Sequence, residues 1–92
     1  MSELTASVLL TNTVGLHARP SVKLTQLAKK FAASIEVAVN AQGPWFDAKS
    51  PVKIMRLKAS QGQTLHFRAI GSDAPRALGD LIALVNARFD EE

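Results

Sequence analysis

The chain has 92 residues, a formal net charge of +3 and 47% apolar residues, which is the composition of a globular protein with one modest core. It contains no cysteine, so disulfides, thiolate metal sites and thiol nucleophiles are excluded. No stretch approaches the roughly 20 apolar residues of a membrane span, and the acidic start MSEL does not fit a secretory signal. We therefore expect a single domain over residues 1–92, located in the cytoplasm.

The first forty residues predict a strand, a helix and a second strand. Alternating apolar side chains over 5–11 indicate a strand with one buried face. Residues 18–31 change to a helical period, and Pro20 lies in the first turn, where its missing N–H has no cost. One face of this helix is apolar, at Leu24, Leu27, Ala28 and Phe31. Strict alternation over 34–40 predicts the second strand.

The next segments predict a short strand, a short helix and a fourth strand. PWFDA follows the AQGP turn and indicates a short strand in which Trp45 or Phe46 faces the core. Ser50 is a good N-cap and Pro51 a good first helical residue, so a second helix begins there. Alternation over 64–70 predicts a strand whose core-facing residues are Leu65, Phe67 and Ala69.

A last helix follows a cap at Ser72 or Asp73. Its apolar stripe comprises Leu78, Leu81, Ile82, Val85 and Phe89. The helix dipole disfavours the acidic DEE at its end, so we expect these residues to fray. The order strand–helix–strand–strand–helix–strand–helix favours an α+β fold. We expect a two-layer open-faced sandwich, with a four-stranded antiparallel sheet covered on one face by three helices.

The run GLHARP, residues 15–20, contains the most informative chemistry in the sequence. It places His17 at the start of a helix, directly after a glycine-containing loop. An unprotonated imidazole is a good nucleophile near neutral pH, and a ring nitrogen can take up a phosphoryl group. N–H groups at the helix start and the Arg19 guanidinium can bind the phosphate oxygens. His17 is therefore a candidate phosphoryl acceptor, and Arg19 a candidate phosphate-binding residue.

These residues alone leave other roles open for both histidines of the chain. A histidine near a helix start is more often a surface residue or a cap than a nucleophile. His66 lies in the middle of a predicted strand on its polar face, where we expect no special role. With two histidines and no cysteine we expect no metal site, and the sequence contains no HExxH, Walker or Rossmann motif.

In its context, GLHARP closely resembles the corresponding run in HPr, the histidine-containing phosphocarrier of the bacterial phosphotransferase system. The resemblance covers nearly the whole chain and includes AKS at 48–50 and the turn at Gly62. It implies that His17 is phosphorylated at Nδ1, that Arg19 supports the phosphoryl group, and that no cofactor is needed. It also implies Enzyme I, phosphorylated from phosphoenolpyruvate, as the donor and an enzyme II A-type domain or related protein as the acceptor. Such a carrier is a monomeric substrate of other enzymes, without turnover of its own.

Ser50 matches the position that a regulatory kinase, HPr kinase, phosphorylates in some members of this family. Its other role, as N-cap of the second helix, is compatible with that one. Pro51 departs from the family pattern, which commonly has an apolar residue other than proline there. A phosphate on Ser50 would disfavour an acidic partner. Incubation with such a kinase and ATP tests the hypothesis, which an unmodified Ser50 would exclude.

A partner-binding surface is predicted beside the GLHARP loop. Val52 and Met55 lie three residues apart on the second helix, where they either form an exposed apolar patch or pack in the core. The resemblance to HPr favours docking by Val52, Met55 and Arg56. Lys23, Lys53 and Arg56 could meet acidic partner surfaces and accelerate encounter.

Two other function classes compete with the sugar-system phosphocarrier. One is an HPr-like regulatory module whose phosphorylation state controls partner binding, in a nitrogen-related or dihydroxyacetone-kinase relay. The runs TNTVGLHARP and NARFDEE resemble the nitrogen-related branch. The other is a nucleic-acid-binding domain, which the scattered basic residues and the single Trp argue against. We therefore expect protein partners, and neither nucleic acid nor a membrane.

Overall fold

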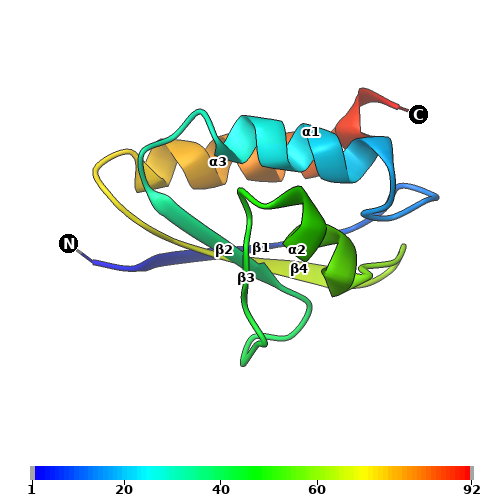
Figure 1. The fold of residues 1–92 in the computed structure, drawn as a ribbon, viewed down its shortest axis with the longest axis horizontal. Helices are drawn as coiled ribbons and strands as arrows, with labels where there is room; N and C mark the ends of the chain where they lie inside the picture. Colours follow the sequence, from blue (N-terminus) through cyan, green and yellow to red (C-terminus); the bar gives the residue numbers. More distant parts are fainter. Residues whose placement is uncertain (1, 92) are drawn as a thin grey trace.

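A computed structural model, which describes residues 2–91, shows a four-stranded antiparallel sheet with helices packed on one face (Figure 1). The elements are β1 (Leu4–Leu9), α1 (Arg19–Ala28), β2 (Ser34–Ala38), β3 (Phe46–Asp47), α2 (Pro51–Leu57), β4 (Thr64–Ile70), α3 (Ala74–Asn86) and a 3-10 turn (Arg88–Asp90). Helices α1 and α3 run side by side above the sheet in Figure 1, and the shorter α2 lies in front of it. The predicted element order and open-faced sandwich are confirmed.

The strands are ordered β1-β4-β2-β3 across the sheet, and every neighbouring pair is antiparallel. Strand β4 therefore lies inside the sheet, between β1 and β2. Its alternation is the predicted one, because Leu65, Phe67 and Ala69 are buried against the helices. Its other residues face the uncovered side of the sheet.

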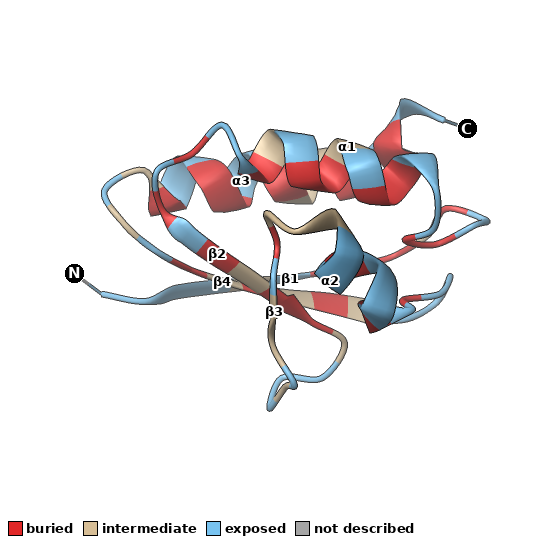
Figure 2. Ribbon diagram, viewed as in Figure 1, coloured by how far each residue is buried: buried red, intermediate tan, exposed pale blue. Residues whose placement is uncertain are grey.

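The core fills the space between the sheet and the helices, where Figure 2 shows the buried residues in red. Its largest fully buried side chains include Phe67, Phe89, Leu10, Leu16, Leu24, Ile35, Ile54, Leu65 and Leu81. Burial of such a side chain contributes about 1.5–3 kcal/mol. Because Leu10 and Leu16 both precede His17 in the loop after β1, the core anchors the chain that leads to this residue.

Two predicted elements, the first helix and the first strand, are longer than those in the structure. Helix α1 begins at Arg19 and ends at Ala28, three residues before Phe31. Phe31 is nevertheless buried, because the chain turns inward there as it approaches β2. Strand β1 ends at Leu9 instead of residue 11, although Leu10 still exchanges main-chain hydrogen bonds with the 62–63 turn.

The end of the chain departs most from the sequence prediction. Helix α3 stops at Asn86, so Phe89 does not continue its apolar stripe. Residues 88–90 instead adopt positive φ values, and this left-handed turn inserts Phe89 fully into the core. The predicted fraying is wrong for Glu91, which makes ion pairs with α1, while Glu92 lies outside the described residues. Burial of the Phe89 ring holds the turn against the body of the protein.

The structure shows which of Trp45 and Phe46 faces the core. Phe46 packs against the core, whereas Trp45 lies on the other side of the sheet, with the Arg68 guanidinium 4.3 Å from its ring centre. Arg68 also pairs with Glu36 over 2.7 Å.

Within the described residues, no helix is long and apolar enough to cross a bilayer.

Candidate functional site

His17 lies exposed in the loop between β1 and α1. The loop is fixed directly before it, because Leu16 is fully buried and its N–H donates to the Ala59 carbonyl over 3.0 Å. Gly15 has φ of +64°, and a Cβ there would lie 2.4 Å from the Ala59 oxygen. This close approach and the left-handed backbone both require glycine. The imidazole is thus presented to solvent by a rigid stretch of chain.

Helix α1 begins two residues after His17. Its N-cap is Ala18, whose φ of 52° and ψ of −125° lie outside the regions that L-residues ordinarily occupy. Backbone strain of this kind costs about 1–3 kcal/mol and tends to occur at functional sites. Ser21 Oγ donates to the Ala18 carbonyl over 2.6 Å, which helps to hold the strained residue.

The helix start next to His17 is electropositive. By the geometry of an α-helix, the first N–H groups have no acceptor within the helix, and Pro20 lacks one altogether. The Arg19 and Ser21 N–H groups therefore point away from the helix start. No acidic residue occupies the first turn to neutralise the helix dipole. The site can bind an anion from both main chain and side chain.

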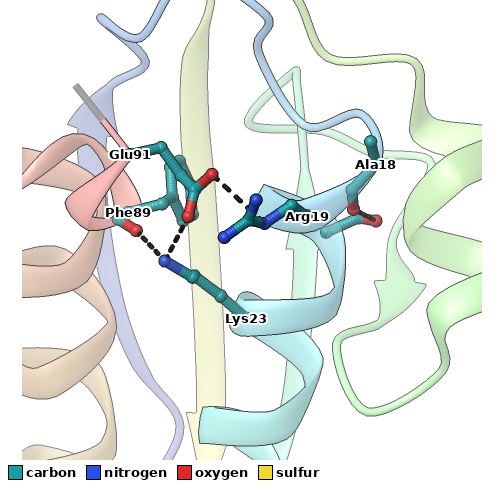
Figure 3. A network of polar contacts seen from close by, with 6 residues as sticks. Ala18, Arg19, Lys23, Phe89 and Glu91 are labelled. Atoms are coloured by element: carbon teal, nitrogen blue, oxygen red, sulfur yellow. Dashed lines mark hydrogen bonds and ion pairs between the residues drawn. The ribbon is translucent and has the colours of Figure 1, made fainter.

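The Arg19 side chain is 78% exposed and pairs with Glu91 over 3.3 Å, as Figure 3 shows. Lys23 Nζ, one turn further along α1, donates to Glu91 over 2.5 Å and to the Phe89 carbonyl over 2.6 Å. The hydrogen bond from Lys23, together with the charge of Arg19, lowers the pKa of the Glu91 carboxyl. The C-terminal turn therefore carries a carboxylate into the candidate site.

Two contacts in this network do not follow from the sequence pattern: that of Glu91 with Arg19 and that of Lys23 with the C-terminal turn. No sequence pattern indicates that Glu91 reaches Arg19, because the contact depends on the left-handed turn at 88–90. The Lys23 ammonium group contacts the C-terminal turn, and its role toward a partner remains a prediction.

Ser50 and Pro51 begin α2 as predicted. The Ser50 hydroxyl accepts the Lys53 N–H over 3.3 Å, and its carbonyl accepts the Ile54 N–H over 3.0 Å. Ser50 is therefore the N-cap of this helix. Its regulatory phosphorylation remains a prediction.

The exposure of α2 decides between the two alternatives for its apolar residues. Val52 is 60% and Met55 47% exposed, whereas Ile54 and Leu57 take the core positions of the helix. Arg56 is exposed as well. Val14 and Val22 add exposed apolar side chains from the His17 loop and α1. The Leu16 N–H donates to the Ala59 carbonyl just after α2, so the His17 loop lies beside the end of this helix, next to its exposed face.

The second histidine lies apart from this face. His66 lines a shallow depression of about 410 Å³ on the uncovered side of the sheet, together with Trp45 and Ser7. Among residues 2–91, no three His, Cys, Asp or Glu side chains are grouped so that they could hold a metal ion.

Comparison with known proteins identifies this arrangement. Residues 4–87 match the family described as the HPr component phosphorylation site of the phosphotransferase system. The chain belongs to the HPr family of phosphocarriers. It is 42% identical over 80 residues to phosphocarrier protein HPr of Cupriavidus necator, covering 87% of this chain and 88% of the relative. It is 35% identical over 86 residues to phosphocarrier protein NPr of Escherichia coli K12, covering 94% of each.

A solved HPr structure has the same fold as this chain. The crystal structure of HPr-C-His from Thermoanaerobacter tengcongensis superposes with a TM-score of 0.86 at 37% identity. The match covers 100% of this chain and 99% of that one. The chain therefore has the HPr architecture over its whole length, including the segment that carries the candidate site.

Proposed function

We propose that His17 accepts a phosphoryl group at Nδ1 from phosphorylated Enzyme I and passes it to an enzyme II A-type domain or a related acceptor. The observation that carries this proposal is the exposed His17 imidazole at the start of α1, beside Arg19. A group that is handed from protein to protein must be reachable by both of them, which excludes a buried site. Residues 1–92 act as one carrier domain.

The transfer conserves atoms and charge in a single displacement. The lone pair of unprotonated Nδ1 attacks phosphorus while the bond from phosphorus to the donor nitrogen breaks, and that electron pair stays on the donor. The proton on Nε2 remains, so the product ring is neutral and carries a phosphoryl anion. In a second displacement an acceptor nucleophile attacks phosphorus while the bond from phosphorus to Nδ1 breaks, and the electron pair returns to Nδ1, which restores free His17.

Positive groups at the helix start support the phosphoryl anion. Free N–H groups of α1 and the Arg19 guanidinium can donate charge-assisted hydrogen bonds to its oxygens. Arg19 must first exchange Glu91 for the phosphoryl group. Each such interaction at an exposed helix start stabilises the bound anion by only about 0.3–1 kcal/mol. Weak binding of this kind suits a carrier that must release the phosphoryl group again.

Phosphorylation with purified components tests the relay. Wild-type protein incubated with Enzyme I and phosphoenolpyruvate should gain one acid-labile, base-stable phosphate. His17→Ala should gain none, while His66→Ala, which changes the other histidine on the far side of the sheet, should be labelled like the wild type. Phosphate on the His17→Ala protein would end the proposal.

Docking is proposed to use Val52, Met55 and Arg56 on the exposed side of α2. This patch has an apolar centre with a basic residue beside it. It would therefore fit a partner surface that is apolar at its centre and acidic at its edge. Met55→Glu should raise the KM of Enzyme I for the carrier by about ten-fold or more, because it buries a charge in the contact. Ala83→Glu adds the same charge at an exposed position of α3, away from α2, and should leave the KM unchanged. An unchanged KM for Met55→Glu would remove α2 from the docking surface.

A second branch is represented among the relatives, since the chain is similar both to an HPr, at 42% identity, and to an NPr, at 35% identity. A nitrogen-related relay, or one that serves a dihydroxyacetone kinase, would use the same chemistry at His17. Transfer rates to a panel of acceptor domains distinguish these branches from the sugar system.

A further inference from the structure

Asn12 is buried in the loop before His17, with 1% of its surface exposed. Its side-chain Nδ2 donates to the Gly15 carbonyl over 2.8 Å. Its main-chain carbonyl accepts the Gly15 N–H over 3.2 Å. One residue therefore holds both polar main-chain groups of Gly15, and the closed turn that results ends two residues before His17.

The peptide between Gly15 and Leu16 is held at both of its polar ends. Its carbonyl accepts from Asn12, and its N–H donates to the Ala59 carbonyl over 3.0 Å. Because a peptide unit is planar, two such hydrogen bonds define its orientation. The fully buried Leu16 side chain fixes the next residue. Asn12 and Ala59 together thus set the direction in which the chain enters His17.

The other polar atom of the Asn12 side chain shows that apolar packing alone does not account for this residue. Oδ1 is buried and has no hydrogen-bond partner in the described part of the chain. Burial of an unpaired amide oxygen is unfavourable, and an apolar side chain at this position would avoid it. Departures from local rules of this kind tend to occur at functional sites. What asparagine supplies here is the Nδ2 hydrogen bond.

We propose that Asn12 is a positioning residue for His17, whose carboxamide fixes the Gly15–Leu16 peptide and so limits the orientations of the imidazole. The inference rests on the proposed phosphorylation of His17. Without the Nδ2 hydrogen bond the peptide is held only through the Leu16 N–H and side chain, so that its orientation is less restricted and the ring samples more directions. A misplacement of about 1 Å can slow a reaction by about 100-fold.

Two variants and one control test this role. Asn12→Asp keeps the size of the side chain but replaces the Nδ2 donor with oxygen, and Asn12→Ala removes both polar atoms. Gln61→Ala is the matched control, because Gln61 Nε2 donates a similar hydrogen bond, over 2.9 Å, to the Thr11 carbonyl in the same loop. Phosphorylation by Enzyme I and phosphoenolpyruvate is measured against carrier concentration, and the His17 ring nitrogens are followed by NMR.

We expect both Asn12 variants to lower kcat by about ten-fold or more, with KM changed less than two-fold, because docking by α2 is untouched. Their ring-nitrogen signals should shift, and Gln61→Ala should match the wild type in every measurement. Folded Asn12 variants with wild-type rates and unchanged ring signals would overturn the inference.

Measurements on the wild type keep the inference testable if the variants do not fold. The Asn12 side-chain amide protons should then exchange slowly and couple across the hydrogen bond to the Gly15 carbonyl carbon, and rapid exchange would overturn the inference. If the wild type takes up no phosphate on His17, the proposed function fails. The ring signals of the unphosphorylated variants would still decide whether Asn12 orients the ring.

Discussion

At the scale of single residues, Arg19 has two competing anions. In the structure its guanidinium pairs with Glu91, and Glu91 is held in addition by Lys23. A phosphoryl group on His17 would offer Arg19 a more strongly charged acceptor within the same turn. Glu91 also places a negative charge near that group. The carboxylate should therefore weaken phosphoryl binding and favour its release.

Glu91→Gln tests this competition. The substitution frees Arg19 and removes the negative charge, so the equilibrium between phosphorylated Enzyme I and the carrier should shift toward phosphorylated His17. An exposed ion pair predicts a shift of roughly two- to five-fold. The measurement is the fraction of phosphorylated carrier at equilibrium, at low and at high salt, because screening should reduce the effect.

Asp90→Asn supplies the control for net charge. It removes one negative charge from the same turn, at a residue outside the Arg19–Glu91–Lys23 network. It should shift the equilibrium much less. Equal shifts in the two variants would show that general charge, and not the contact with Arg19, is responsible.

At the scale of elements, Asp73 joins the start of α3 to the loop between α1 and β2. Its carboxylate accepts the Ala32 N–H over 2.8 Å and the Ala33 N–H over 2.9 Å. Lys49 Nζ, from the segment before α2, donates to the Phe31 carbonyl in the same loop over 2.7 Å. Three segments distant in sequence are thus joined by a few polar contacts. The N–H of Ala32 is the largest cause of the lowered pKa of Asp73, and Lys49 lowers it further.

This contact predicts a pH dependence of stability. Because the pKa of Asp73 is lower in the folded state, its contribution is complete above the unfolded value of about 3.8 and is lost as the pH falls through the folded value. Asp73→Asn should therefore lower the urea midpoint at pH 7, and the difference from the wild type should shrink by pH 3. Urea unfolding at pH 7, 4 and 3 measures this.

Asp80→Asn removes the same charge from an exposed position on α3. Its urea midpoint at pH 7 should stay near that of the wild type. A difference between Asp73→Asn and the wild type that did not shrink at all between pH 7 and pH 3 would contradict the assigned cause, because the contribution of a carboxylate with a lowered pKa decreases once the pH falls below its unfolded value.

At the scale of the whole molecule, periodic patterns predicted the fold because burial is repeated along each element. The alternation of Leu65, Phe67 and Ala69 was enough to place β4, and GLHARP was enough to place His17 at a helix start. Single contacts between distant segments leave no such pattern. The positions of Asn12 and Glu91 depend on one turn each, so neither could be found from the sequence.

The same limit explains the error at the end of the chain. Phe89 has the spacing of the α3 stripe, and periodicity alone extends the helix to it. Burial of the ring is achieved equally well by a left-handed turn, which stops α3 at Asn86. The sequence determined that Phe89 is buried, whereas the local backbone was decided by tertiary packing.

The insertion of Phe89 into the core has a practical consequence for fusion proteins. It brings Glu91 to Arg19, whereas Leu4 begins β1 at the end of that strand away from the His17 loop, and Figure 1 shows the two termini on opposite sides. A tag, linker or neighbouring domain that continues from Glu91 would emerge beside Arg19, two residues after His17, and should obstruct incoming proteins. One attached ahead of Leu4 would leave that approach open, which makes the amino end the preferred attachment point for immobilisation or for building a multidomain relay.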